Sequence, residues 1–366
     1  MGATGDTDTG PGSGTARPRA DRAISGPAAG GLTHAPHRRL ESPTGVRSRL
    51  ARANERAVVI AYRGASGLLG RLPIAISWPA VRGLMLSGYA VWPAKRRIIL
   101  ANAAHILGRR SDDPATRELA RRIYQTYARY LVELMRLPRL PEHVPAMLVD
   151  ADGERGVDSF GGIWRRYSAQ GRGVIAVSIH IGSVETLVAA VAAQGFPTYA
   201  LADDSSYPEL YALLQAQRRR WGVEVFAWSN LRRTFAVLRQ PAVLGLLVDW
   251  GYRADGIPVR LFGDWTTLPA GPAALAAKTG AVIVPLVCRR LPNGRFIAEH
   301  FEPIEVADDS PAELARATQA IADAVEEMVR PAPEQWYTFK PIWPVTTEEA
   351  QALAARARSS GGPGAR

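Results

Sequence analysis

The sequence predicts an α/β protein with a mostly parallel central sheet flanked by helices and a helical region at its N-terminus. After about residue 155, short unbroken apolar runs of strand length alternate with segments of helical pattern, as in parallel sheets that are covered on both faces. Before that point, apolar residues recur every three or four positions, as in amphipathic helices. The hydrophobic fraction of 47% is ordinary for a globular protein.

The N-terminal segment differs in composition from the rest of the chain. Residues 1–48 are rich in Gly, Pro, Ser, Thr and Ala and carry no periodic hydrophobic residues, so we expect them to be disordered. They contain no uninterrupted apolar core of the kind found in a secretory signal. The C-terminal SSGGPGAR has a similar composition and is expected to be a loose tail.

The next segment, from Val58 to Trp92, is apolar but repeatedly interrupted by arginines and by two prolines. Its uncharged runs are shorter than the roughly 20 apolar residues that span a bilayer. Aromatic residues and arginines among aliphatic ones favour a helical hairpin that lies in a membrane interface. The alternative is a buried helix pair that packs on the main domain.

Two amphipathic helices are expected next. The first covers Lys95–Leu107. The second begins with Asp113 as its cap and Pro114 at the first helical position, which together are a good start signal. We therefore divide the chain into a disordered tail at 1–48, a helical membrane-associated region at 49–140, an α/β core at 141–346, and a C-terminal helix end and tail at 347–366.

Six runs in the core are predicted to be strands, and helices are expected between most of them. Ligands of parallel sheets bind beyond the carboxyl ends of the strands, and His180 follows such an end. The strand-like runs are GVIAVSI (173–179), PTYALA (197–202), GVEVFAW (222–228), AVLGLLVDW (242–250), AVIVPLVCRR (281–290) and GRFIAEHFEP (294–303).

Charge and motif content limit the function. The formal net charge is +11, which favours an anionic partner such as a nucleic acid, an anionic membrane surface or a phosphate-bearing ligand. A single cysteine forms no internal disulfide. The sequence has no Walker loop, no zinc-type cluster and no G-x-S-x-G elbow, and the missing elbow argues against a serine esterase. It also lacks an aromatic–basic platform of the kind that binds nucleic acid.

The segment that carries candidate chemistry is HIGSVE, residues 180–185. If His180 ends a strand and Glu185 lies in the first turn of the following helix, the carboxylate can reach one imidazole nitrogen. The other nitrogen is then free to take a proton from an alcohol, and amides at the helix start can stabilise an oxyanion. The plainer alternative is that Glu185 only complements the helix dipole.

HIGSVE resembles the H-x4-D/E motif of the glycerolipid acyltransferase superfamily, in the glutamate form of the late lipid A acyltransferases. Residues 243–287 are similar to a stretch of those enzymes and of actinobacterial phosphatidylinositol mannoside acyltransferases, and WPAKRRIILANAAHILG (92–108) resembles the family's early helix. The resemblance covers about residues 55–345. The chain departs from the mannoside-type relatives in having Pro258 and Arg260 before Phe262-Gly263, where they often carry acidic residues, and in using Glu where they often use Asp. The matching features of the 243–287 stretch are Asp249, Phe262-Gly263, Gly271-Pro272, Leu275-Ala276, Thr279-Gly280-Ala281 and Pro285.

The resemblance implies that His180 is the general base and that Glu185 orients it. It places Asp249 and the Phe262–Asp264 turn on the acceptor side. It also places a basic residue of the SNLRR block, residues 229–233, near a substrate phosphate. The predicted substrate-binding residues are Ser183, Arg232, Arg233, Asp249, Phe262, Gly263, Asp264 and Gly271.

The implied function is transfer of a fatty acyl group from acyl-CoA or acyl carrier protein to a hydroxyl of a glycolipid or lysophospholipid, with a phosphatidylinositol mannoside-like acceptor favoured. No cofactor or metal is expected. The expected partners are the lipid acceptor, the acyl donor and an anionic membrane surface at the cytoplasmic face, and no nucleic acid is expected. Two alternatives stay open at this point: an acyl thioesterase and a non-catalytic basic lipid-binding protein.

Overall fold

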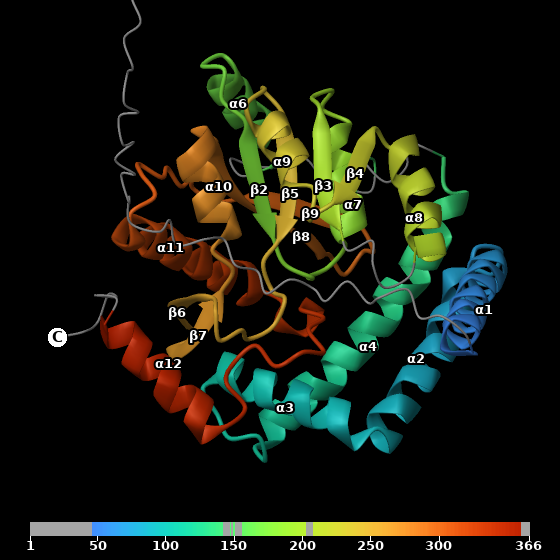
Figure 1. Cartoon of the computed structure of the whole chain (residues 1–366). Coiled ribbons are helices and arrows are strands. Elements are labelled where there is room, and N and C mark those ends of the chain that lie inside the picture. The colour runs from blue at the N-terminus through green and yellow to red at the C-terminus, as the bar shows by residue number, and fades with distance from the viewer. Residues whose placement is uncertain (1–45, 142–146, 148, 151–155, 203–207, 360–366) are drawn as a thin grey trace, which may run out of the picture. The chain divides into compact units, whose positions relative to one another are not determined.

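The computed structural model of the chain describes residues 46–141, 147, 149–150, 156–202 and 208–359 (Figure 1). All of these residues lie in one compact unit, Leu40–Arg366. The predicted disordered tail at 1–48 lies outside the described residues up to residue 45, but Val46, Arg47 and Ser48 belong to helix α1, so the tail prediction is wrong for these three residues. The predicted C-terminal tail, SSGGPGAR (359–366), lies outside them as well, except for Ser359, which ends α12 (Thr347–Ser359).

Among the described elements, four α-helices and one short 3-10 helix precede the first strand of the sheet. Pro73 lies between the first two helices and caps the second. The helix α4 begins as predicted: the Asp113 side chain accepts a hydrogen bond of 2.8 Å from the Ala115 amide, and Pro114 occupies the first helical position. The α3–α4 contact buries Ile99 and Ile123. The elements are α1 (Val46–Leu69), α2 (Ile74–Val91), α3 (Pro93–Leu107), α4 (Pro114–Arg136) and the short 3-10 helix η1 (Leu137–Arg139).

A seven-stranded sheet forms the centre, in the order β1-β9-β8-β2-β5-β3-β4. Every neighbouring pair is parallel except β8–β9, which is antiparallel, so the predicted mainly parallel sheet is confirmed. A separate antiparallel hairpin, β6–β7, was not expected from the sequence. The strands are β1 (Val149–Asp150), β2 (Val174–Ser178), β3 (Thr198–Ala202), β4 (Val223–Ala227), β5 (Val243–Leu247), β6 (Ile257–Leu261), β7 (Asp264–Leu268), β8 (Val282–Arg290) and β9 (Phe296–His300).

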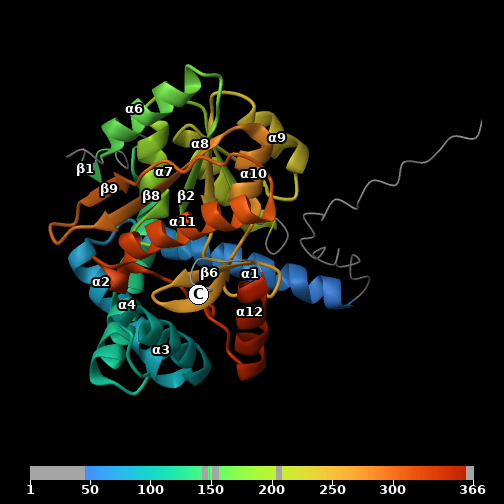
Figure 2. The same cartoon turned by 90° about the vertical axis from the view of Figure 1, so that its left-hand side faces the viewer.

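Helices cover both faces of the sheet, because β2, β5 and β8 bury side chains on both sides. One face packs Ile175 and Leu244 against α9, α10, α11 and the β6–β7 hairpin. The other face packs Val174 and Val282 against α6 and α7. In both views α3 and α4 lie at the opposite end of the unit from α6 and α9 (Figure 1, Figure 2). The remaining helices are α6 (Val157–Ser168), α7 (Val184–Ala192), α8 (Pro208–Arg220), α9 (Leu231–Leu238), α10 (Gly271–Thr279), α11 (Pro311–Val329), η2 (Pro333–Gln335) and α12 (Thr347–Ser359).

The first two helices present apolar side chains to solvent. Ile60 of α1 and Leu84 of α2 are 70% and 71% exposed, and Trp92 just after α2 is 59% exposed. Among the described residues, α2 is the one helix long and apolar enough to cross a membrane, judged by length and composition alone. Since α2 is largely exposed, it does not form the buried helix pair considered as an alternative, and its contact with a membrane stays a prediction.

Candidate active site

Two neighbouring strands bring His180 and Asp249 together at one edge of the sheet. The register of β2 and β5 pairs Ser178 with Leu247. His180 and Asp249 each lie two residues beyond that pair, so they leave the sheet at the same level. Parallel strands expose their carboxyl ends at a common edge, where ligands of such sheets bind.

The Asp249 carboxylate holds His180 at two points. One oxygen, Oδ1, lies 2.7 Å from His180 Nδ1, and the other, Oδ2, accepts the His180 backbone amide at 2.9 Å. Oδ2 also accepts the indole N–H of Trp336 at 2.9 Å. The Asp249 side chain is 3% exposed and the His180 side chain 47% exposed. The imidazole is therefore fixed through Nδ1 by a buried carboxylate, while part of the ring faces solvent.

The pair is electrostatically coupled. Burial disfavours the charged imidazole, but the Asp249 carboxylate outweighs this effect and the pKa of His180 is raised above its ordinary value. Burial also disfavours the Asp249 carboxylate, yet His180 and the donated N–H bonds outweigh it and lower the pKa of Asp249. A hydrogen bond from Nδ1–H to the carboxylate leaves Nε2 as the proton acceptor.

The structure corrects the prediction that Glu185 contacts the His180 ring. Glu185 forms a two-point ion pair with Arg218 of α8, at 2.6 and 3.1 Å, and both side chains are mostly buried. It lies in the first turn of α7, as expected, and its charge contributes to the raised pKa of His180 as a minor cause. The carboxylate at hydrogen-bonding distance is Asp249, which the resemblance places on the acceptor side.

A tight turn at Gly182 separates His180 from α7. Gly182 has a φ of 58°, and a Cβ at this position would lie 1.8 Å from the Cys288 carbonyl oxygen, so only glycine fits. Its amide donates to the Gln335 carbonyl at 3.1 Å, and the Ser183 amide donates to the Cys288 carbonyl at 3.2 Å. These two amides, which directly precede α7, are thus occupied within the protein and are not free to bind an oxyanion.

Comparison with known proteins identifies the family of the chain. The family model of the bacterial lipid A biosynthesis acyltransferases matches residues 47–344. The chain belongs to this acyltransferase family. It is therefore an enzyme that transfers acyl groups to oxygen, and both the α/β core and the N-terminal helices lie within the matched region.

Two named relatives show how similar this acyltransferase is to other proteins of its kind. A phosphatidylinositol mannoside acyltransferase of Mycolicibacterium smegmatis is 26% identical over 306 residues, which cover 75% of this chain and 95% of that protein. A phosphatidylinositol mannoside acyltransferase of Mycobacterium tuberculosis is 28% identical over 242 residues, which cover 64% of this chain and 73% of that protein.

The predicted Phe262–Asp264 turn of the acyltransferase is the tip of the β6–β7 hairpin. Phe262 and Gly263 both have positive φ, 52° and 84°, and Phe262 is the single non-glycine with positive φ among the described residues. Its ring lies 6.4 Å from the rings of Trp336 and Trp343. Asp264 bonds His105 Nδ1 of α3 at 2.6 Å. The turn therefore packs next to the tryptophan that holds Asp249.

The other predicted substrate residues occupy several places along the carboxyl edge of the sheet. The Ser183 hydroxyl is buried and bonds the Thr186 hydroxyl at 2.7 Å as a helix cap. Arg232 is exposed at the start of α9, whereas Arg233 pairs with Glu224. Gly271 is the first residue of α10. Because β4 is the third strand from β2, these arginines lie well apart from His180.

Two residues near His180 were not predicted from the sequence. Trp336 touches Asp249, and the Lys340 charge acts on the pKa of His180 in the lowering direction. Both belong to the segment PEQWYTFK, which follows α11 and has no periodic pattern. An aromatic residue in such a segment is as consistent with packing as with a polar role, so nothing in the sequence marks Trp336.

Proposed function

We propose that this acyltransferase moves a fatty acyl group from an acyl thioester to a hydroxyl of a phosphatidylinositol mannoside-type glycolipid, with His180 as general base. The observation that carries the proposal is the half-exposed His180 ring, whose Nδ1 is bonded to the buried Asp249 carboxylate. The relatives are named for that glycolipid, which supports the choice of acceptor.

The proposed reaction is a direct transfer. His180 Nε2 takes the proton of the acceptor hydroxyl as its oxygen attacks the thioester carbonyl carbon. The new ester C–O bond forms, the C–S bond breaks, and the imidazolium returns the proton to the departing thiolate. Asp249 keeps the ring in the required tautomer and stabilises the imidazolium. No cofactor takes part in this proposal, and the donor is acyl-CoA or acyl carrier protein.

We assign Glu185 a supporting role in this site. Its ion pair with Arg218 connects the first turn of α7 to the end of α8, just after the His180 turn. We keep Arg232, which is exposed, as the proposed contact for a substrate phosphate, and the Phe262–Asp264 turn as the proposed acceptor side. Arg233 is less suited to this role because Glu224 already neutralises it.

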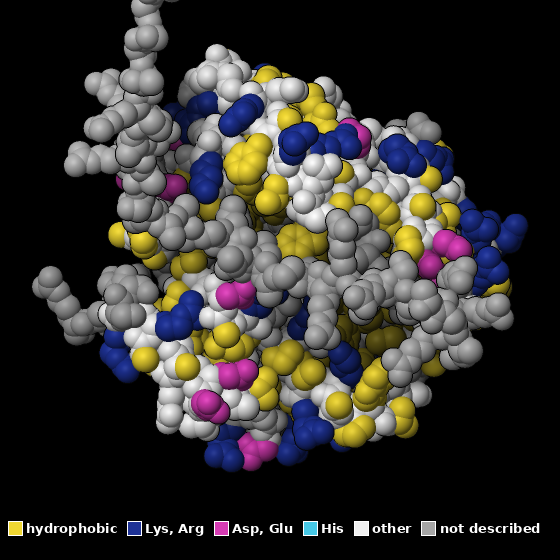
Figure 3. All heavy atoms as spheres, in the orientation of Figure 1, with side chains coloured by type: hydrophobic (Ala, Val, Ile, Leu, Met, Phe, Trp, Pro, Cys, Tyr) yellow, Lys and Arg dark blue, Asp and Glu magenta, His cyan; other side chains and the backbone are white. Residues whose placement is uncertain are grey.

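We further propose that α1 and α2 lie on an anionic membrane at the cytoplasmic face. Exposed apolar side chains on these helices alternate with the exposed Arg63 and Arg82. Arginines interact with anionic headgroups while the apolar side chains enter the interface. In the space-filling view, apolar side chains lie beside basic ones at the lower right, where Figure 1 places α2 (Figure 3).

The test is transfer of labelled palmitate from palmitoyl-CoA, or from palmitoyl acyl carrier protein, to a panel of lipid acceptors. We expect acceptor-dependent product from the wild-type chain and a loss of about 100- to 10,000-fold in His180→Ala. Free palmitate that forms regardless of acceptor would instead make the chain a thioesterase. Equal transfer by His180→Ala would refute the role of His180.

A further inference from the structure

We infer that Trp336 is a positioning residue of this acyltransferase. Its indole N–H holds the Asp249 carboxylate in the orientation in which the carboxylate can bond and position the His180 ring. The inference rests on the proposed function of His180 as the base. Asp249 Oδ2 accepts two N–H bonds of 2.9 Å, from the Trp336 indole and the His180 amide, which leaves Oδ1 for the imidazole at 2.7 Å. With both donors in place, the carboxylate cannot rotate without losing a buried hydrogen bond.

The segment that carries Trp336 also holds the backbone of His180. Trp336 is 1% exposed and forms an antiparallel bridge with Ile181. On either side of it, the Tyr337 amide donates to the His180 carbonyl at 2.8 Å, and the Gln335 carbonyl accepts the Gly182 amide at 3.1 Å. His180 is therefore fixed through its amide by Asp249 and through its carbonyl by the segment 335–337.

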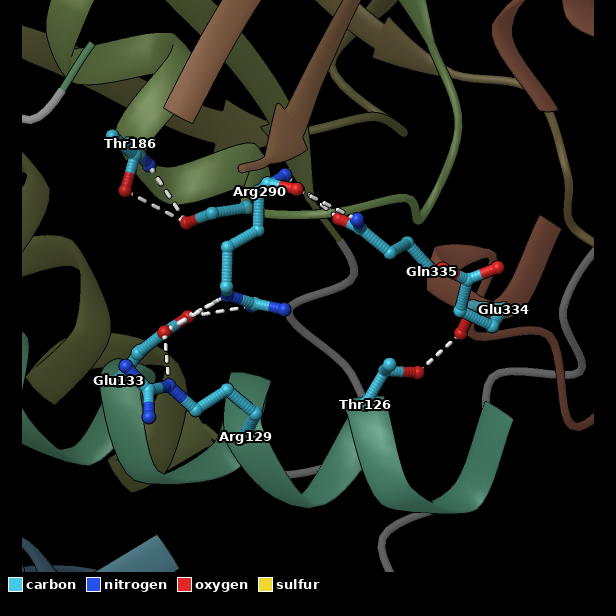
Figure 4. A network of polar contacts seen from close by, with 8 residues as sticks. Thr126, Arg129, Glu133, Thr186, Arg290, Glu334 and Gln335 are labelled. Carbon is cyan, nitrogen blue, oxygen red and sulfur yellow. Dashed lines mark hydrogen bonds and ion pairs between the residues drawn. The ribbon is translucent and has the colours of Figure 1, made fainter. Parts of the chain in front are cut away.

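Buried polar side chains anchor this segment in turn (Figure 4). The Gln335 amide group makes two bonds to the Arg290 backbone, accepting at 2.7 Å and donating at 2.9 Å. The Arg290 guanidinium pairs with Glu133 of α4 at 2.6 Å, and Arg129 bonds the same carboxylate at 2.8 Å. Burial and charge-assisted bonds make this connection between β8, α4 and the segment rigid.

Packing alone does not account for the indole N–H of Trp336. Trp343 is also buried, at 3% exposure, and both indoles contact the Phe262 ring. The Trp343 N–H, however, has no hydrogen-bond partner among the described residues. An apolar ring is therefore enough at position 343, whereas at position 336 the N–H donates to Asp249, the carboxylate that bonds His180 Nδ1.

The experiment compares Trp336→Phe with Trp343→Phe in the full chain. For Trp336→Phe we expect kcat to fall about 10- to 100-fold with the KM of each substrate nearly unchanged, since a hydrogen bond to a buried charge is lost. Trp343→Phe removes similar volume but no hydrogen bond, so its kcat should stay within about threefold of wild type. Replacing Trp336 with benzothienylalanine, in which sulfur takes the place of N–H, keeps the volume and should reproduce the loss in kcat.

A second measurement does not require turnover. NMR titration of the His180 ring reports the field of Asp249, Lys340 and Glu185, the charged groups that act on it. A carboxylate that has lost its orientation bonds the ring less well, so Trp336→Phe should lower the pKa of His180 while Trp343→Phe leaves it unchanged. Equal titration and equal kcat losses in the two variants would show that Trp336 only packs. Absence of transfer by the wild-type chain would contradict the proposed function, and the titration would still decide the role of Trp336.

Discussion

At the residue scale, the exposed His180 ring depends on a carboxylate that the rest of the molecule buries. The Asp249 side chain is 3% exposed and bonded by three N–H groups from two residues. A buried carboxylate is stable only when such donors compensate for its lost hydration. The site therefore combines a fixed negative charge behind the ring with an accessible ring edge, which suits a base whose substrate arrives from solvent.

The first prediction concerns the pH dependence of transfer. Because Asp249 raises the pKa of His180 above its ordinary value, the imidazole is protonated at low pH and activity should increase as pH rises through that raised pKa. In Asp249→Asn the effect of burial, which lowers the pKa of His180, remains without the opposing carboxylate. The increase of activity with pH should therefore occur at lower pH. The maximal rate should fall about 100- to 10,000-fold because the tautomer is no longer fixed. If kcat/KM rose over the same pH range in Asp249→Asn as in the wild-type chain, the pairing of Asp249 with His180 would be contradicted.

The second prediction separates Glu185 from Asp249. Glu185→Gln leaves the mostly buried Arg218 without its partner and should lower the free energy of unfolding by about 3 kcal/mol. The double variant Glu185→Gln/Arg218→Met should be more stable than Glu185→Gln, as measured by denaturant unfolding. Well below its unfolding temperature, Glu185→Gln should keep more activity than Asp249→Asn. A folded Glu185→Gln protein as inactive as Asp249→Asn would assign Glu185 a direct part in the reaction.

At the scale of elements, the turn between β2 and α7 places the ring and the helix. Gly182 lies against the Cys288 carbonyl of β8, and the following Ser183 caps α7. The turn is therefore held by β8 and α7 on one side and by the segment 335–337 on the other. Its left-handed backbone and its close approach to β8 leave no room for a side chain.

The third prediction uses this crowding. Gly182→Ala should lower the free energy of unfolding by roughly 3 kcal/mol or more, since it adds both backbone strain and a clash with the Cys288 carbonyl. Gly280, which ends α10 at a φ of 71° with open space around it, provides the matched control. Gly280→Ala should cost only about 1 kcal/mol, the strain alone. Similar losses of the two variants in thermal or denaturant unfolding would show that the close approach of Gly182 to β8 is not the main cause.

At the scale of the whole molecule, the described unit has one strongly apolar exposed part. Leu84 and Val91 of α2 are 71% and 79% exposed, and neither belongs to the buried cluster between α3 and α4. The net charge of +11 adds attraction to an anionic surface. An enzyme with a lipid acceptor gains from such a surface because its substrate diffuses in the membrane.

The fourth prediction tests this surface by sedimentation with anionic vesicles. Leu84→Glu should weaken vesicle binding about tenfold or more, since it removes an apolar contact and introduces a repelled charge. Val345→Glu, at a position that is 72% exposed but outside α1 and α2, should bind like the wild-type chain. Added salt should weaken the binding of all three chains. Equal weakening by both substitutions would move the contact away from α2.

Most of the local structure and the family could be predicted from the amino-acid sequence. Periodicity and start signals predicted α3, α4, α7 and the strands β2, β3, β4, β5, β8 and β9, and the motif at 180–185 together with the 243–287 stretch indicated an acyltransferase. These features depend on residues close together in the chain, such as Asp113 and Pro114 at the start of α4, so their pattern is visible without a fold. The prediction of His180 at a strand end needed no more than this.

Which carboxylate bonds His180 could be seen only in the folded chain. In the chain Glu185 is five residues away and Asp249 sixty-nine, so proximity in sequence favoured Glu185. The strand order places β5 directly beside β2, although β3 and β4 lie between them in sequence, and the register brings Asp249 level with His180. Trp336 arrives from still farther along the chain. Strand order and long-range contacts arise from the packing of whole elements, and no local pattern records them.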